Sequence, residues 1–119
     1  MALEHEFFML TLEITNKIMD NEIIVFYQNN RKSAVCIQDD LILANLNAFK
    51  DINTVTSYPN KPTLSKGLNY YGYTIFMPNS LSQLLVLLKK ISKGNEFSQL
   101  IALCEEAHQK NVAVLHYGI

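Results

Sequence analysis

Runs of β-branched and aromatic residues predict most of a sheet. Residues 23–28 and 33–38 are such runs, and the Asn-Asn-Arg-Lys sequence between them suits a tight reversal, so they predict a β-hairpin. Residues 70–77 predict a third strand, which ends at Pro78 because proline cannot donate a hydrogen bond in a central ladder. Residues 112–117 are apolar at almost every position, which is typical of a strand covered on both faces.

Leucines at helical spacing predict a helix that begins at Ser80 and ends near Gly94. Ser80 and Gln83 form a capping-box pattern, and the lysines before Gly94 suit the negative end of the helix dipole. A second helix follows, with Asn95 as its cap and Asn111 as its stop. The connection made by the two helices is long enough to place the flanking strands parallel.

Two segments in the N-terminal half leave alternatives open. Residues 3–19 show the period of a strand, yet their apolar residues also fall on one helical stripe; a helix is favoured and the choice stays open. Asp39 and Asp40 suit a turn. After them, the sequence from Leu41 begins either a short strand or a helix that runs on toward Phe49.

A change of composition marks residues 53–67. Asn, Thr, Ser, Lys and Gly dominate there, and Pro59 and Pro62 block a regular helix or ladder. The segment also contains Val55 and Tyr58, side chains that a plain flexible linker lacks. We therefore predict one long exposed loop of the kind that carries function.

These elements predict a single α+β domain over residues 1–119, with a mainly antiparallel sheet and helices packed on one face. The chain is 49% hydrophobic and 18% charged, which is the balance of a globular protein. Its length allows a core to form without a disulfide or a structural metal. The formal net charge of −1 gives no overall attraction to nucleic acid.

Cysteine usage and the first residues predict a cytoplasmic protein. Cys36 and Cys104 lie in apolar runs, so both are expected to be buried, reduced thiols. Glu4 and Glu6 stand where a secretion signal would carry positive charge. The apolar runs are shorter than the roughly 20 residues of a membrane-spanning helix, so no membrane association is expected.

Histidine and acidic residues give no complete catalytic or metal-binding motif. Glu105-x-x-His108 is half of a di-iron pattern, and Cys104 with His108 is half of a zinc pattern, so neither a metal nor another cofactor is expected. His108 and His116 would form an acid–base pair if the last helix and strand brought them together, and a small acid–base enzyme is the lowest-ranked function. An ordered cavity in which imidazole and carboxylate groups converge would overturn the protein-binding assignment favoured below.

Tyrosines and lysines provide candidate binding residues. Tyr70 and Tyr71 are adjacent in a predicted strand, so they cannot both point inward, and an exposed tyrosine suits the anchor of a protein interface. The mixture of tyrosines with Lys61, Lys66 and Lys89 would also suit base stacking and phosphate contacts. Protein binding is favoured over nucleic-acid binding because the helix dipole already explains lysines at a helix end.

In size, class and mild acidity the chain resembles small bacterial immunity proteins, which neutralise toxins delivered by neighbouring cells. No residue motif carries the resemblance, and immunity proteins against nuclease toxins are commonly more acidic. The resemblance implies a stoichiometric inhibitor that binds a toxin domain through aromatic anchors and complementary charge, with no oligomeric state indicated. The candidate partner-binding residues are Asp39, Asp40, Tyr58, Lys61, Tyr70 and Tyr71.

Overall fold

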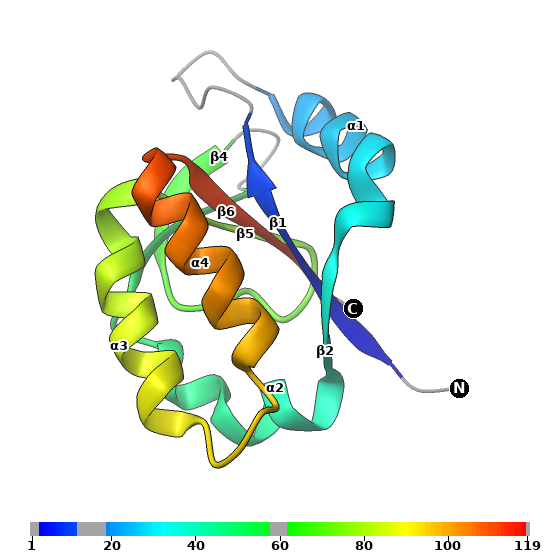
Figure 1. Cartoon of the computed structure of the whole chain (residues 1–119). Coiled ribbons are helices and arrows are strands. Elements are labelled where there is room, and N and C mark those ends of the chain that lie inside the picture. Colours follow the sequence, from blue (N-terminus) through cyan, green and yellow to red (C-terminus); the bar gives the residue numbers. More distant parts are fainter. Residues whose placement is uncertain (1–2, 12–18, 58–61, 119) are drawn as a thin grey trace.

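Every strand pairing in the described part of the chain is antiparallel. The computed structural model describes residues 3–11, 19–57 and 62–118, and these contain one sheet of order β2-β1-β6-β5-β3-β4 (Figure 1). Its strands are β1 (Glu4–Leu10), β2 (Val35–Gln38), β3 (Asn53–Ser57), β4 (Pro62–Lys66), β5 (Tyr73–Phe76) and β6 (Ala113–Tyr117). The predicted α+β class with a mainly antiparallel sheet is confirmed.

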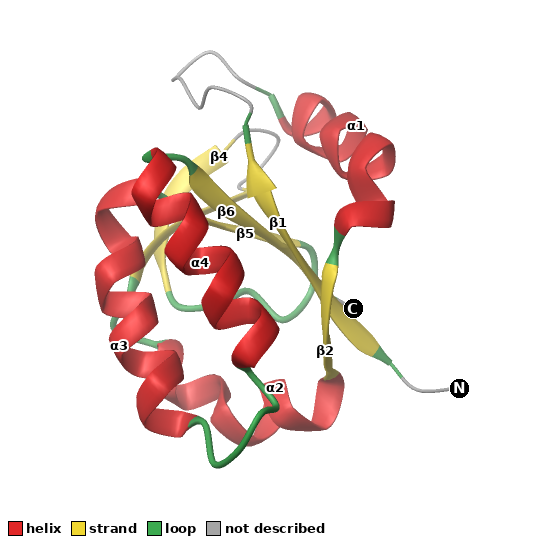
Figure 2. Cartoon of the chain, viewed as in Figure 1, coloured by secondary structure: helices red, strands yellow, loops and turns green. Residues whose placement is uncertain are grey.

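Most of the helical structure packs on one face of the sheet. The helices are α1 (Asp20–Asn30), α2 (Asp39–Asn45), α3 (Leu81–Ile91) and α4 (Ser98–Lys110), with short 3-10 turns η1 (Arg31–Ser33), η2 (Leu46–Phe49) and η3 (Pro78–Ser80) (Figure 2). α3 and α4 lie side by side across the sheet, and α2 closes its lower end (Figure 1). Leu84, Leu88 and Leu100 are buried there against Phe7 and Val114.

A second core lies on the opposite face, under α1. Ile23 of α1 is fully buried in a cluster with Phe8, Ile75 and Leu115, whose side chains alternate with those that face α3 and α4. The strands of this sheet are therefore covered on both faces near the middle, which explains the nearly continuous apolar sequence of β6.

The hairpin predicted over residues 23–28 and 33–38 is wrong in its first half, because residues 23–28 belong to α1. Asp20 and Glu22 lie in the first helical turn, and the Glu22 carboxylate accepts a 2.8 Å hydrogen bond from the Met19 backbone N–H. This cap and the favourable helix dipole outweigh the weak strand preference of the β-branched residues. Only β2 remains of the predicted pair.

The helix favoured for residues 3–19 and the loop predicted for residues 53–67 are also wrong where the structure describes them. β1 occupies the first segment, while residues 12–18 lie outside the described residues. β3 and β4 pair in the second, with Val55 opposite Leu64. Pro62 is compatible with a strand because it begins β4, which lies at the sheet edge, where no ladder donor is required.

The chain returns from β5 to β6 through two helices, and this connection reverses its direction. The parallel arrangement allowed by the sequence is wrong, because α3 and α4 form an antiparallel pair that brings β6 back against β5 in the opposite direction. Ser80 is the N-cap residue of α3 as predicted, but it makes no side-chain cap hydrogen bond, because its hydroxyl donates to the Asn53 carbonyl at 2.8 Å. Asn95 precedes α4 without capping it, since Phe97 holds the cap position. Asn111 ends α4 as predicted.

The remaining elements are confirmed, either with shorter bounds than predicted or as one of the two possibilities that the sequence left open. The sequence from Asp39 toward Phe49 is helical, as α2 and η2, so Asp39 and Asp40 begin a helix instead of forming a turn. β5 starts only at Tyr73, which leaves Tyr70 and Tyr71 in the turn before it. Cys104 is buried as expected, whereas Cys36 is exposed in edge strand β2; both thiols are free.

Candidate functional site

Two histidines occupy core-facing positions on neighbouring strands. On β1, His5 has the same orientation as Phe7, and on β6, His116 has the same orientation as Val114, so both imidazoles point toward the face covered by α2, α3 and α4. Both side chains are 0% exposed. Buried polar groups need hydrogen-bond partners, and the two histidines find them in each other, in Asp39 and in Thr74.

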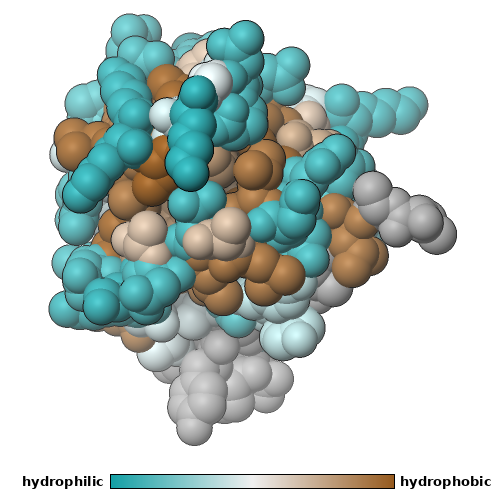
Figure 3. All heavy atoms as spheres, turned by 90° about the horizontal axis from the view of Figure 1, so that it is seen from below, coloured by the Kyte–Doolittle hydropathy of each residue, from teal (hydrophilic) through white to brown (hydrophobic). Residues whose placement is uncertain are grey.

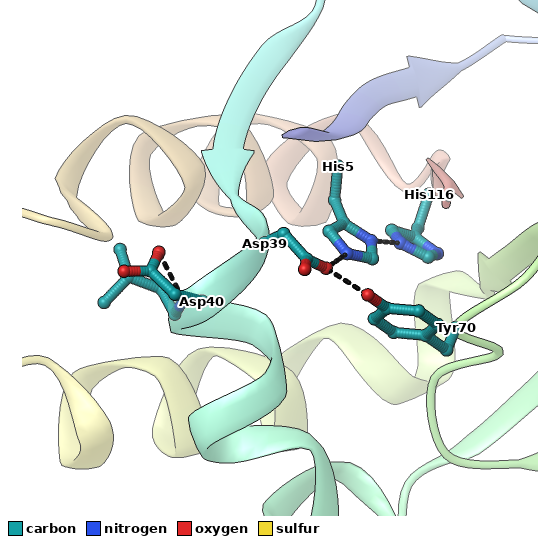
Figure 4. A network of polar contacts seen from close by, with 6 residues as sticks. His5, Asp39, Asp40, Tyr70 and His116 are labelled. Atoms are coloured by element: carbon teal, nitrogen blue, oxygen red, sulfur yellow. Dashed lines mark hydrogen bonds and ion pairs between the residues drawn. The ribbon is translucent and has the colours of Figure 1, made fainter. Parts of the chain in front are cut away.

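The two imidazoles are the centre of a hydrogen-bonded row that crosses the sheet (Figure 4). His5 Nδ1 lies 2.8 Å from His116 Nε2, and the rings are within 16° of coplanar, which places this contact in the ring planes. His5 Nε2 lies 2.9 Å from Asp39 Oδ1. At the other end, His116 Nδ1 lies 3.3 Å from Thr74 Oγ1 on β5, and that oxygen accepts the Asn69 backbone N–H at 2.8 Å.

One arrangement of protons satisfies this row with both imidazoles neutral. The Asp39 carboxylate only accepts, so His5 Nε2–H donates to it and His5 Nδ1 is an acceptor. His116 Nε2–H then donates to His5 Nδ1, which leaves His116 Nδ1 to accept from the Thr74 hydroxyl. Burial and the neighbouring His5 lower the pKa of His116 to about 3, in agreement with a neutral ring.

Asp39 and Tyr70 form the exposed end of the row. The Tyr70 hydroxyl donates to Asp39 Oδ1 at 2.5 Å, the same oxygen that His5 contacts. These hydrogen bonds, first from Tyr70 and then from His5, lower the pKa of Asp39. The same bond to a carboxylate raises the pKa of Tyr70 to about 12. Asp39 is therefore ionised and Tyr70 protonated at neutral pH.

The turn that carries Tyr70 is held at both of its ends. Gly72 adopts φ +97°, a conformation that glycine provides without strain, and its carbonyl accepts the Gly118 N–H at 2.6 Å. A Cβ atom on Gly118 would lie 2.1 Å from the Tyr70 carbonyl oxygen, so this position has room only for glycine. Asn69 adds the bond to Thr74 and a 3.1 Å bond from its amide to Thr56. We call residues 67–72 the tyrosine turn.

The tyrosine turn presents one ring to the protein and one to solvent. Tyr70 packs at 5.2 Å from His5, ring centre to ring centre, while Tyr71 is 69% exposed and meets the edge of Tyr70 at 4.8 Å and 87°. Close to Asp39 the surface has a depression of about 310 Å³, lined by Leu3, Gln38, Asp39 and Asp40. Asp40 points away from the row (Figure 4), so the two aspartates do not act as a pair.

No protein-family model, no curated protein and no solved structure matches this chain. The site must therefore be interpreted from its own geometry.

Four of the six candidate partner-binding residues lie in one region. Asp39 and Tyr70 are hydrogen-bonded to each other, Tyr71 packs edge-to-face against Tyr70, and Asp40 follows Asp39 at the depression. The other two, Tyr58 and Lys61, lie outside the described residues. The two short segments meet although 31 positions separate Asp39 from Tyr70.

The row contains imidazoles and a carboxylate, but not the pair suggested by the sequence. His116 bonds to His5 and Thr74, whereas His108 is exposed on α4. All four nitrogens of the buried imidazoles lie within hydrogen-bond distance of a protein atom, so neither ring offers a free nitrogen to a substrate. Asp39 is a weak base because its pKa is lowered. These features indicate that the histidines and Asp39 hold neighbouring residues in position and do not transfer protons to a ligand.

Other chemistry suggested by the sequence finds little geometric support. Within residues 3–11, 19–57 and 62–118, no group of three or more His, Cys, Asp or Glu side chains is arranged to hold a metal ion. The helices of these ranges are also too short or too polar to cross a bilayer. Of the lysines considered for nucleic acid, Lys89 lies 3.9 Å from Glu105, and Lys66 is exposed on β4.

Sequence reasoning missed His5, the residue that joins the two halves of the row. The alternation of side chains along a strand could have revealed it. If this segment is a strand, His5 lies on the same face as Phe7 and Met9, so a polar residue occupies a core position. A helical interpretation of this segment hides that signal. His116 carries the same signal beside Val114 on the last strand.

Proposed function

We propose that this protein is a protein-binding domain whose recognition surface comprises Tyr71, Leu3, Asp40 and the Asp39–Tyr70 pair. The observation that carries the proposal is a solvent-exposed aromatic ring on a turn that is fixed from behind: Tyr71 is 69% exposed, yet Tyr70 is bonded to Asp39. A rigid aromatic side chain loses little conformational freedom on binding, which makes it an effective anchor.

Exposed apolar and acidic groups at the start of β1 and on α2, the helix that carries Asp39, support the same proposal. Leu3 is 55% exposed and Leu43 on α2 is 52% exposed. Viewed from the α2 end, the molecule shows hydrophobic groups dispersed among hydrophilic ones (Figure 3). Asp40 adds an exposed carboxylate beside the depression. An anchor ring with apolar neighbours and a charged rim is the usual composition of a protein interface.

We further propose that the partner is a toxin domain and that the protein acts in the cytoplasm of a bacterium as an immunity protein. In this role the surface binds the toxin one to one and blocks its active site. The small size, the α+β class and the satisfied polar interior support a stoichiometric binder, because all four imidazole nitrogens of the row are held by protein atoms.

The test begins with the reading frame next to the one that encodes this chain, which the proposal predicts to encode a large secreted protein with a toxin domain at its C-terminus. Its C-terminal domain is expressed in the cytoplasm with and without the present chain, and growth and complex formation are measured. Protection and a one-to-one complex are expected. Tyr71→Ala should weaken the complex roughly thirtyfold, as for an interface anchor worth about 2 kcal/mol, with unchanged thermal unfolding.

Val86→Ala is the matched control, since Val86 on α3 is also 69% exposed and lies outside the proposed surface. It should leave affinity unchanged. A toxin that kills equally in the presence of the chain, or a complex that loses as much affinity with Val86→Ala as with Tyr71→Ala, would contradict the proposal.

A further inference from the structure

The buried row has a second arrangement of protons that fits the same heavy atoms. If His5 carries protons on both nitrogens, Nε2–H still donates to Asp39, but Nδ1–H now donates to His116 Nε2. His116 stays neutral and must move its own proton to Nδ1. It then donates to Thr74 Oγ1 instead of accepting from it.

The change at His116 reaches the tyrosine turn through Thr74. In the neutral row, Thr74 Oγ1 donates to His116 and accepts the Asn69 N–H. In the protonated row, the same oxygen must accept from both His116 and Asn69, and its own proton loses the acceptor that His116 provided. The oxygen has two lone pairs and can accept both bonds, but Thr74 is buried, so a hydroxyl proton without an acceptor is costly. A movement of Thr74 that gives this proton a new partner would stretch the Asn69 bond, which holds the turn.

We propose that the His5–His116 pair is a proton-sensitive latch: it holds the tyrosine turn when both rings are neutral and loosens it when the pair takes up one further proton. The consequence for binding rests on the proposed function, because Tyr71 loses its fixed position when the turn loosens. Acidification of the surroundings would then weaken the complex.

The groups that face the pair determine where the proton goes. Asp39 at the start of α2 supplies the only carboxylate bonded to either ring among the described residues, so the added proton belongs on His5 and not on His116. Tyr70 from the tyrosine turn is protonated, and the Cys104 thiol of α4, on the same sheet face, is neutral because burial raises its pKa to about 12. Glu4 and Glu6 alternate to the opposite face.

The test is an NMR titration of the free, full-length protein labelled with ¹⁵N in its imidazoles, from about pH 7.5 to about pH 5. Two-bond couplings identify which nitrogen carries the proton. We expect His116 to change from Nε2–H to Nδ1–H as His5 becomes doubly protonated. Over the same range, the protection factor of the Asn69 amide, which is its intrinsic exchange rate at that pH divided by the observed rate, should fall roughly tenfold, as expected from the loss of one anchoring hydrogen bond.

Three variants make the result specific. Thr74→Val removes the shared oxygen, so Asn69 exchange should be fast at both pH values. His108→Gln removes an exposed histidine outside the row and should change nothing. Exchange at Leu115, in the middle of the sheet, reports whether the fold persists. If Thr74→Val does not fold, the titration of the unmodified protein still decides.

The latch is overturned if His116 keeps its proton on Nε2 while His5 becomes doubly protonated, or if Asn69 exchange does not follow that change. These outcomes are separate from failure of the proposed function. If the proton moves from Nε2 to Nδ1 of His116 but the chain does not bind the neighbouring toxin domain, the latch is supported and the proposed function is refuted. If the proton of His116 stays on Nε2 and the chain binds the toxin equally well at both pH values, the proposed function is supported and the latch is refuted.

Discussion

Tyr70 and Tyr71 are adjacent in sequence, and their hydroxyl groups have opposite surroundings. Tyr70 donates to Asp39 at 2.5 Å, while no hydrogen bond of the Tyr71 hydroxyl is seen within the described residues, and its ring is 69% exposed. A hydrogen bond to a charged group is worth about 1.5–3 kcal/mol, more than one between neutral groups. The two residues therefore form a natural pair for separating stability from recognition.

Tyr70→Phe should lower the free energy of unfolding by about 1–3 kcal/mol, since it removes a donor to a carboxylate. It should also raise the pKa of Asp39, because the Tyr70 hydrogen bond is the largest cause of its lowering. Urea unfolding and an NMR titration of the Asp39 carboxyl group measure these effects. Tyr71→Phe is the control and should leave both quantities unchanged; equal effects from the two variants would refute the assignment.

At this scale, sequence reasoning named residues that the structure brings together and missed the contacts that hold them. Asp39, Tyr70 and Tyr71 were recognisable as an acidic residue before an apolar run and as exposed aromatic candidates. Their contact depends on tertiary structure that joins two distant segments, and no local pattern reports it. His5 required the strand interpretation of residues 4–10, because only the period of two places it beside Phe7 on the core face.

Elements with a strong terminal signal were predictable, and those decided by neighbouring strands were not. α3 has a leucine face and a lysine-rich end, and α4 ends at Asn111 with φ 55°. By contrast, β4 carries few of the residues that favour strands, and the β-branched residues of β3 stand in a segment with the composition of a loop; the two strands form because β5 supplies a ladder for β3 and β3 one for β4. α1 shows the reverse, since residues with strand preference form a helix when their ends are capped.

The end of α4 gives a test at the scale of an element. The Asn111 N–H bonds to His108 O at 3.2 Å and the Val112 N–H to Ala107 O at 3.0 Å, which is a Schellman motif with a left-handed residue. Asn111→Ala should lower the free energy of unfolding by about 1–2 kcal/mol, because alanine is strained in this conformation. Asn111→Gly should not lower it.

Chemical denaturation of the three proteins measures this effect. Equal losses in Asn111→Ala and Asn111→Gly would mean that the asparagine side chain, and not the backbone conformation, stabilises the helix end.

For the whole molecule, the buried row links folding to pH. The pKa of His116 is lowered to about 3 in the folded protein, whereas an unfolded histidine titrates near about 6.5. Between these values the unfolded state binds more protons than the folded state, so stability falls as the pH falls. Asp39 acts in the same direction at lower pH: its pKa is lowered by folding, so its contribution is lost below its ordinary value of about 3.9.

The free energy of unfolding should therefore decrease by roughly 2 kcal/mol between about pH 7 and about pH 5, as measured by urea unfolding at each pH. His116→Gln should flatten this dependence, whatever its effect on stability at neutral pH. His108→Gln should preserve it, since His108 is exposed. An unchanged slope in His116→Gln would show that another group carries the pH dependence.

The position of β6 between β1 and β5 also affects how the protein is made. A ribosome synthesises β1 early and β6 last, with 111 positions between His5 and His116. At about 5–20 residues per second, β1 waits on the order of 10 s for its central neighbour. During that time Phe7 and Phe8 lack their final cover, so the nascent chain should be a substrate for chaperones until β6 has been made and has paired with β1.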